Sequence, residues 1–86
     1  MPIIKVRSPH ADYDLPDADS IKQRIGQRIR EQRLLLRMSQ EELAKNVGKK
    51  TATYIALIEK GTRNISAVDL ARIAHHFKID LSFFYP

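Results

Sequence analysis

The chain contains no cysteine, so neither a disulfide framework nor a thiolate zinc site can hold it together. No apolar run approaches the roughly 20 residues that a membrane-spanning helix needs. The N-terminal stretch MPIIKVRSPHADYDLPDADS has too short an apolar run, with acids after it, for a signal peptide. With 86 residues the chain has room for one small domain, and we expect it in the reducing cytoplasm.

The charges are unevenly distributed along the chain. Residues 1–19 carry two basic and four acidic side chains, whereas residues 20–86 carry 13 basic and six acidic ones, a net charge of +7. An excess of this size points to a polyanionic partner such as nucleic acid, although many basic surfaces are simply solvated.

The residue patterns give no support to catalysis or metal binding. His75 and His76 are adjacent, so on a helix their side chains point about 100° apart and cannot share a metal as an i, i+4 pair would. No serine or carboxylate pair has a base partner at the spacing of a catalytic motif. We therefore expect a protein that is not an enzyme and that has no metal site and no cofactor.

The first helix signal follows an irregular N-terminal arm. Residues 1–19 are rich in proline and poor in helix formers, and a short strand at IIKVR and a disordered tail are the two alternatives for this arm. Ser20, with Gln23 three residues later, predicts a capping box at the start of a helix that ends near Arg37. The apolar residues of this helix recur at spacings of four and seven and predict one buried stripe, made of Ile21, Ile25, Ile29 and Leu36.

A second, short helix is indicated by the segment SQEE. Its serine, Ser39, is followed three residues later by Glu42, which is the pattern of a capping box. Gly48 is placed to end this helix, because glycine adopts the left-handed conformation of a helix C-terminus without strain.

Three more helices are expected, with caps at Thr51, Ser66 and Asp80. The third runs to about Lys60 with Ile55 and Ile58 facing inward, the fourth is AVDLARIAHHF, and the last is the short turn LSFFY. The chain is therefore predicted to be all-α, with an N-terminal arm at residues 1–19 and a compact five-helix domain at residues 20–86.

Two short helices that meet at Gly48, the second with outward polar groups at its N-terminus, are typical of a helix-turn-helix. Residues 25–84 resemble the lambda-repressor-like (XRE) family of DNA-binding domains, through the combination of SQEELA, I-x-x-I-E-x-G and L-x-x-I-A. The resemblance implies a lambda-repressor-like fold and a sequence-specific transcriptional regulator, most simply a repressor. In such a protein the third helix enters the major groove of DNA, which is about 12 Å wide, and the second spans the phosphate backbone.

The resemblance also implies roles for particular residues. Gln40 matches a glutamine that contacts phosphate, and Arg33 and Glu59 match a pair that joins the first helix to the third. Arg33 lies on the buried stripe, where its positive charge needs an acidic partner. The alternative is that its long side chain extends along the surface and places the guanidinium in solvent. The residues expected to contact bases are Ala52, Thr53, Tyr54 and Leu57. Their methyl-rich side chains favour contacts with the thymine methyl over bidentate hydrogen bonds.

Contacts with the DNA backbone are expected at both ends of the third helix. The residues before it are Lys49, Lys50 and Thr51, and those after it are Lys60, Thr62, Arg63 and Asn64. When the sequence is aligned with the family on Glu59, the stretch before this helix is one residue longer than usual, and Lys49 is the inserted residue. The alternative for both segments is a solvated turn.

The resemblance further implies a homodimer that binds double-stranded DNA at half-sites about 34 Å apart. In this family the last helix often forms the dimer contact, which predicts an interface made of Leu81, Phe83, Phe84 and Tyr85, although these residues could instead cover the small core. Two other hypotheses are an antitoxin that also binds a toxin protein, and the DNA-binding headpiece of a longer regulator.

Overall fold

The computed structural model describes residues 17–85, and this part of the chain contains four α-helices and a closing 3-10 turn. The elements are α1 (Ala18–Leu35), α2 (Gln40–Asn46), α3 (Thr53–Lys60), α4 (Ala67–Phe77) and η2 (Leu81–Phe84). The described part is therefore all-α, as predicted, but the fifth expected helix is only a 3-10 turn. The predicted N-terminal arm falls almost wholly outside the described residues.

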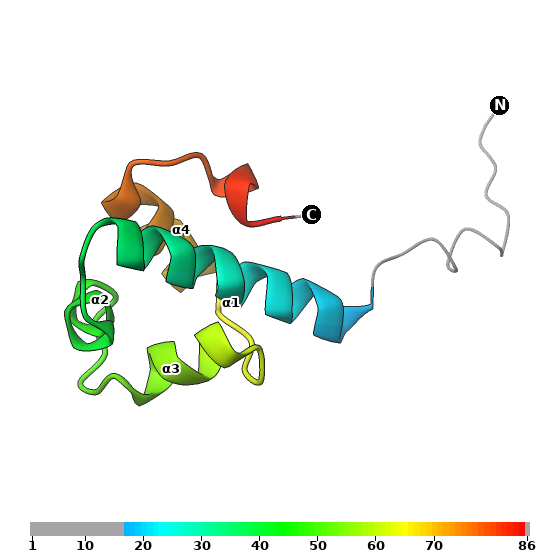
Figure 1. The fold of residues 1–86 in the computed structure, drawn as a ribbon, viewed down its shortest axis with the longest axis horizontal. Coiled ribbons are helices and arrows are strands. Elements are labelled where there is room, and N and C mark those ends of the chain that lie inside the picture. Colours follow the sequence, from blue (N-terminus) through cyan, green and yellow to red (C-terminus); the bar gives the residue numbers. More distant parts are fainter. Residues whose placement is uncertain (1–16, 86) are drawn as a thin grey trace, which may run out of the picture.

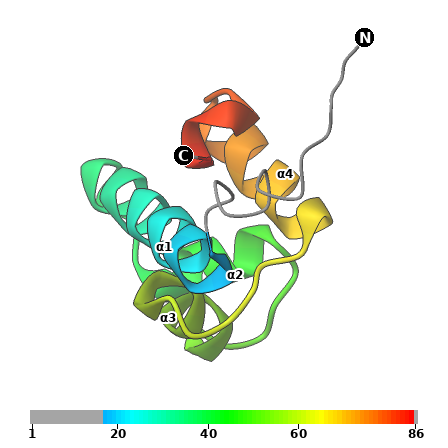
Figure 2. The same ribbon diagram turned by 90° about the vertical axis from the view of Figure 1, so that its right-hand side faces the viewer.

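The long helix α1 has α3 on one side and η2 on the other (Figures 1 and 2). α3 packs against α1 and α2, whereas η2 packs against α1 and α4. Side chains from all five elements meet in one core, which is made of Ile25, Ile29, Leu43, Ala44, Val47, Tyr54, Ile55, Ile58, Leu70, Ile73, Ala74, Phe77 and Phe84. None of the helices in residues 17–85 is long and apolar enough to cross a membrane.

Side-chain caps start three of the helices where the sequence predicts them. Ser39 and Glu42 form the expected capping box, with distances of 3.0 and 2.8 Å between the bonded atoms. The hydroxyl of Ser66 accepts a hydrogen bond from the backbone N–H of Asp69 at the start of α4, and Asp80 caps η2. These bonds satisfy backbone donors that the helix itself leaves free, which fixes where each element begins.

The other two caps differ from the prediction. α1 is capped by Asp17, whose carboxylate accepts the backbone N–H of Ser20 at 2.8 Å, so the prediction of a cap at Ser20 is wrong. An ionised carboxylate at this position also interacts favourably with the helix dipole, which explains why the helix starts earlier. The prediction for Thr51 is wrong as well, because α3 begins after Ala52 and has no side-chain cap.

The buried stripe of α1 is shorter than predicted. It consists of Ile25, Gly26, Ile29 and Arg33, and it ends before Leu36, which is 50% exposed. The helix stops at Leu35, and the chain then turns at Arg37 with a positive φ of 56°. The prediction of a buried Leu36 is therefore wrong, because the periodicity of α1 does not continue to that residue.

Candidate nucleic-acid interface

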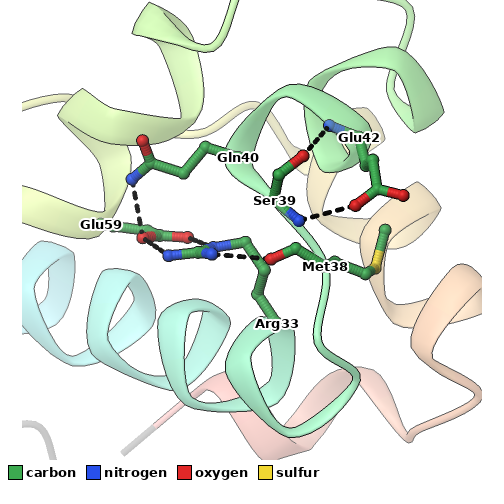
Figure 3. A network of polar contacts seen from close by, with 6 residues as sticks. All are labelled: Arg33, Met38, Ser39, Gln40, Glu42 and Glu59. Atoms are coloured by element: carbon green, nitrogen blue, oxygen red, sulfur yellow. Dashed lines mark hydrogen bonds and ion pairs between the residues drawn. The ribbon is translucent and has the colours of Figure 1, made fainter.

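Arg33 connects three segments of the domain, namely α1, α3 and the turn before α2, through one guanidinium group (Figure 3). Its Nε and Nη2 atoms donate hydrogen bonds to the two carboxylate oxygens of Glu59 in α3, at 2.7 and 2.9 Å. Its Nη1 atom donates to the backbone carbonyl of Met38, in the turn before α2, at 2.8 Å. The side chains of Arg33 and Glu59 are only 9% and 2% exposed, so the pair is largely shielded from water. The hydrogen bond to Glu59 raises the pKa of Arg33.

Gln40 extends this network to α2. Its Nε2 atom donates to Oε1 of Glu59 at 3.1 Å, so the first residue of α2 is tied directly to α3 (Figure 3). A buried bidentate ion pair with additional hydrogen bonds tolerates little change in geometry. The network of Arg33, Glu59 and Gln40 therefore holds α2 and α3 at a fixed orientation to α1.

The inward and outward faces of α3 are clearly divided. Ile55 and Ile58 are 0% and 1% exposed and lie in the core, as predicted. Thr53 is exposed, and Leu57 is half-buried on the part of the helix that the core does not cover. Ala52, directly before the helix, is also half-buried. The outward face of α3 is therefore narrow and rich in methyl groups.

Tyr54 does not lie on this outward face. Its side chain is in the core, with 9% of the residue exposed, and its hydroxyl donates a hydrogen bond to the carboxylate of Asp69 in α4 at 2.5 Å. The prediction that Tyr54 contacts a base is therefore wrong, because both its ring and its hydroxyl are already engaged within the domain.

Sequence reasoning missed Asp69, which is the centre of a second polar cluster. Besides the bond from Tyr54, its carboxylate lies 3.5 Å from Nζ of Lys49 and 3.7 Å from Nη1 of Arg72. Burial alone would raise the pKa of Asp69, but the hydrogen bond from Tyr54 and the positive charge of Lys49 hold it below its ordinary value. In a sequence, an aspartate in the first turn of a helix usually indicates an exposed carboxylate that interacts with the helix dipole. The role of Asp69 therefore becomes visible only from the side chains that surround it in the structure.

Lys49 and Arg63 flank α3 and meet at the ring of Tyr54. The Nζ atom of Lys49 is 4.6 Å from the ring centroid, and the guanidinium carbon of Arg63 is 4.9 Å from it. Of the other residues predicted to contact the DNA backbone, Thr62 donates its hydroxyl to the carbonyl of Leu57 at 3.2 Å. The remaining side chains of this group are exposed to solvent, namely Lys50, Thr51, Lys60 and Asn64.

The four residues predicted to form a dimer interface differ in exposure. Phe84 is 0% exposed and belongs to the core, so its assignment to an interface is wrong, because it is the side chain by which η2 packs on the domain. Leu81 and Tyr85 are 40% and 45% exposed. Phe83 is half-buried, with the guanidinium carbon of Arg28 at 4.8 Å from its ring centroid.

Residues 29–84 match the helix-turn-helix family HTH_3, and the chain belongs to this family, as its resemblance to XRE-type domains predicts. It is a DNA-binding domain of the class found in transcriptional regulators, and this class is not enzymatic.

The chain is similar to two uncharacterized HTH-type transcriptional regulators, from Sinorhizobium medicae (strain WSM419) and from Rhizobium meliloti (strain 1021). Each is 39% identical over 61 residues, which cover 71% of this chain and only 43% of the relative. This chain therefore spans less than half the length of these relatives.

Two solved structures share the fold. The restriction-modification controller protein C.AhdI from Aeromonas hydrophila has a TM-score of 0.69 and 32% sequence identity, over 77% of this chain and 98% of that protein. The hypothetical transcription factor NHTF from Neisseria has a TM-score of 0.70 and 25% identity, over 85% of this chain and 83% of that protein.

Proposed function

We propose that the chain is a sequence-specific transcriptional regulator that binds a palindromic operator as a homodimer, with α3 in the major groove. The observation that carries this proposal is the buried network of Arg33, Glu59 and Gln40, which fixes α2 and α3 relative to each other. A helix-turn-helix needs such a fixed orientation, because one helix must lie across the backbone while the other enters the groove. The simplest mode of action is repression by occlusion of a promoter.

Base recognition is assigned to the outward face of α3. Thr53 is exposed there, and Ala52 and Leu57 are partly exposed beside it. These side chains present methyl groups, and only Thr53 adds a hydroxyl that can donate or accept a hydrogen bond. We therefore expect the operator to place thymine methyl groups opposite this face.

Backbone binding is assigned to residues around the two ends of the helix-turn-helix. Gln40 uses one amide hydrogen on Glu59, and the amide carries a second hydrogen that can donate to a phosphate. Gln40 is the first residue of α2, and the positive end of a helix dipole at this position favours an anion. Exposed polar side chains around α3 complete the proposed set, which consists of Lys49, Lys50, Thr51, Lys60, Thr62, Arg63 and Asn64.

Dimerisation is assigned to the C-terminal surface formed by Leu81, Phe83 and Tyr85. Leu81 and Tyr85 expose 40% and 45% of their surface next to the half-buried Phe83. Aromatic and apolar groups that remain exposed together are enriched at interfaces. A two-fold dimer would present two copies of α3 to half-sites about 34 Å apart.

The likeness to C.AhdI favours a more specific version of this function. That protein is a restriction-modification controller, and the match covers 98% of its length. A controller that regulates the genes of a restriction-modification system is therefore the second candidate. The greater length of the two rhizobial relatives favours a third, in which this domain is the DNA-binding part of a longer regulator.

The test is selection of bound fragments from the source genome by the purified chain, followed by measurement of affinity for the selected site and for random DNA. The proposal expects an inverted repeat with half-sites one helical turn apart and a specific affinity at least about 10³-fold above that for random DNA. Fragments lying upstream of restriction and modification genes would support the controller function. Equal affinity for all fragments would exclude sequence-specific regulation.

A further inference from the structure

Tyr54 brings together two cations that are far apart in the sequence. Lys49 precedes α3 and Arg63 follows it, yet both charged groups lie within 5 Å of the centroid of one aromatic ring. We infer that Tyr54 is a positioning residue, which gathers Lys49 and Arg63 on one flank of α3 so that both bind the phosphate backbone of the same DNA segment. This inference rests on the proposed DNA-binding function and assigns a role to a residue that contacts no DNA itself.

The ring of Tyr54 is held at both ends. Its body is packed in the core, and its hydroxyl donates to Asp69 at the N-terminus of α4. Burial raises the pKa of the hydroxyl, so it stays protonated and remains a donor at neutral pH. The carboxylate of Asp69 is ionised under the same conditions, and a hydrogen bond to an ionised acceptor is stronger than one between neutral groups. The ring therefore offers the cations a fixed surface.

A cation resting on an aromatic face keeps its hydrogen-bond donors for a second partner. The ring attracts the charge electrostatically, whereas the N–H groups of a stacked guanidinium lie in its own plane. Arg63 is exposed, and the side chain of Lys49 is 40% exposed, so both can reach a ligand in solvent. The ring thus restrains the two side chains without occupying their donors, which reduces the entropy lost when they bind.

The local charge balance favours an anionic ligand at this flank. Two cations held near one ring repel each other, and the buried carboxylate of Asp69 offsets part of that repulsion from the Lys49 side. Arg72 also faces Asp69, so the carboxylate is shared among three charged or polar neighbours. Positive charge therefore remains in excess at the surface, and the ligand of matching chemistry in the proposed complex is a DNA phosphate.

The test compares the salt dependence of operator binding in variants of position 54. Tyr54→Phe keeps the ring and removes the hydroxyl. Phenylalanine carrying five fluorines, inserted at the same position, keeps the shape of the ring but reverses the charge of its face, so it no longer attracts cations. Tyr54→Leu removes the ring altogether. The measured quantity is the slope of log K against log salt concentration, which reports the number of phosphates that the protein neutralises.

The inference predicts the wild-type slope for Tyr54→Phe. For the pentafluorinated ring and for Tyr54→Leu it predicts a slope smaller in magnitude by about 3.6 for the proposed dimer, because each of the two subunits loses two phosphate contacts and each contact contributes about 0.9. The double variant Lys49→Gln with Arg63→Gln should show the same reduction. When Tyr54→Leu is added to this double variant, the slope should not change further. If Tyr54 only stabilised the fold, adding Tyr54→Leu would still weaken DNA binding by the double variant.

Equal slopes for the pentafluorinated ring and for Tyr54→Phe would overturn the inference even if Tyr54→Leu failed to fold. An unchanged slope for the double lysine and arginine variant would also overturn it, while leaving the proposed regulator function intact, because the operator would still be bound. Wild-type protein that binds no DNA at any salt concentration would overturn both.

Discussion

Gly26 of α1 lies directly against the backbone carbonyl of Ile58 in α3. A Cβ atom built on Gly26 would be 2.0 Å from the carbonyl oxygen and 3.0 Å from the carbonyl carbon, and neither backbone atom can move without shifting α3. The glycine thus permits the close approach of the two helices between which Arg33 and Glu59 also form their ion pair. The sequence does not predict this role, because a single glycine in a helix forms no repeating pattern that would indicate close packing against another helix.

Gly26→Ala should therefore destabilise the domain, although alanine is the better helix former by about 1 kcal/mol. The methyl group must push α3 away from α1, and overpacking of this kind lowers the free energy of unfolding by about 1 to 3 kcal/mol. Urea unfolding followed by circular dichroism measures the change. The control is Gln27→Ala at the exposed neighbouring position, which should change the free energy by less than about 0.5 kcal/mol. Equal effects of the two substitutions would contradict the close approach.

Glu59→Ala should lower the free energy of unfolding by about 3 to 5 kcal/mol, because it leaves the buried guanidinium of Arg33 without its partner. Adding Arg33→Met to a Glu59→Leu variant should recover much of this loss, since an apolar pair avoids the unpaired charge. Thermal and urea unfolding give the comparison. The matched control is Glu41→Ala on the exposed surface of α2, and a Glu59 variant as stable as this control would show that the pair contributes little.

Stability should fall in acid partly through Asp69. Its pKa is lower in the folded protein than the ordinary value of about 3.9, so its contribution is fully present above that pH and is lost as the pH falls through the folded pKa. The difference in free energy of unfolding between wild type and Asp69→Asn should therefore shrink from pH 7 toward pH 3. Tyr54→Phe should weaken the same pH dependence, because it removes the bond that lowers the pKa. A constant difference across this range would argue against an ionised Asp69 as the centre of the cluster.

Thr53→Ala and Leu57→Ala should each reduce discrimination between operator and random DNA by about 1 to 3 kcal/mol per lost base contact. Lys60→Gln is the contrasting variant, since a lost phosphate contact should weaken binding to both DNAs alike. Fluorescence anisotropy with the two duplexes at one salt concentration separates these effects. Unchanged discrimination in both α3 variants would mean that other residues read the bases.

Tyr85→Glu should convert the proposed dimer to monomers, because it places a charge at the exposed C-terminal surface without disturbing the buried Phe84. Sedimentation equilibrium measures the change in mass. Val68→Glu, at an apolar position of α4 that is 60% exposed, is the control and should leave the dimer intact. Dissociation by Val68→Glu with retention of the dimer by Tyr85→Glu would move the interface to α4.

The sequence was sufficient for those features that depend on local pattern. The capping box of Ser39 and Glu42 and the inward pair Ile55 and Ile58 follow from spacing alone, and the structure confirms them. The sequence predicts a base contact for Tyr54, whereas the structure places this residue in the core. Its partner Asp69 is 15 residues away on another helix, and no local pattern connects the two.

The sequence predicts Phe84 at a dimer interface, whereas the structure places it in the core, and the reason is related. An aromatic residue near the end of a chain is compatible both with an interface and with a core, and only the packing of η2 on α1 and α4 decides between them. Apolar character therefore predicts that a side chain will be buried. Only the three-dimensional arrangement determines whether the domain's own core or a second subunit buries it.

The division of α3 into an inward and an outward face has a consequence for how this protein can change. The residues that hold the helix are Tyr54, Ile55, Ile58 and Glu59, and none of them is among the residues that the proposed function assigns to base contacts. Exchanging Thr53 or Leu57 alters little of the core, so new side chains can be tried there without loss of the fold. The domain could therefore acquire a different operator by drift or by engineering in small steps, each of which leaves a folded protein.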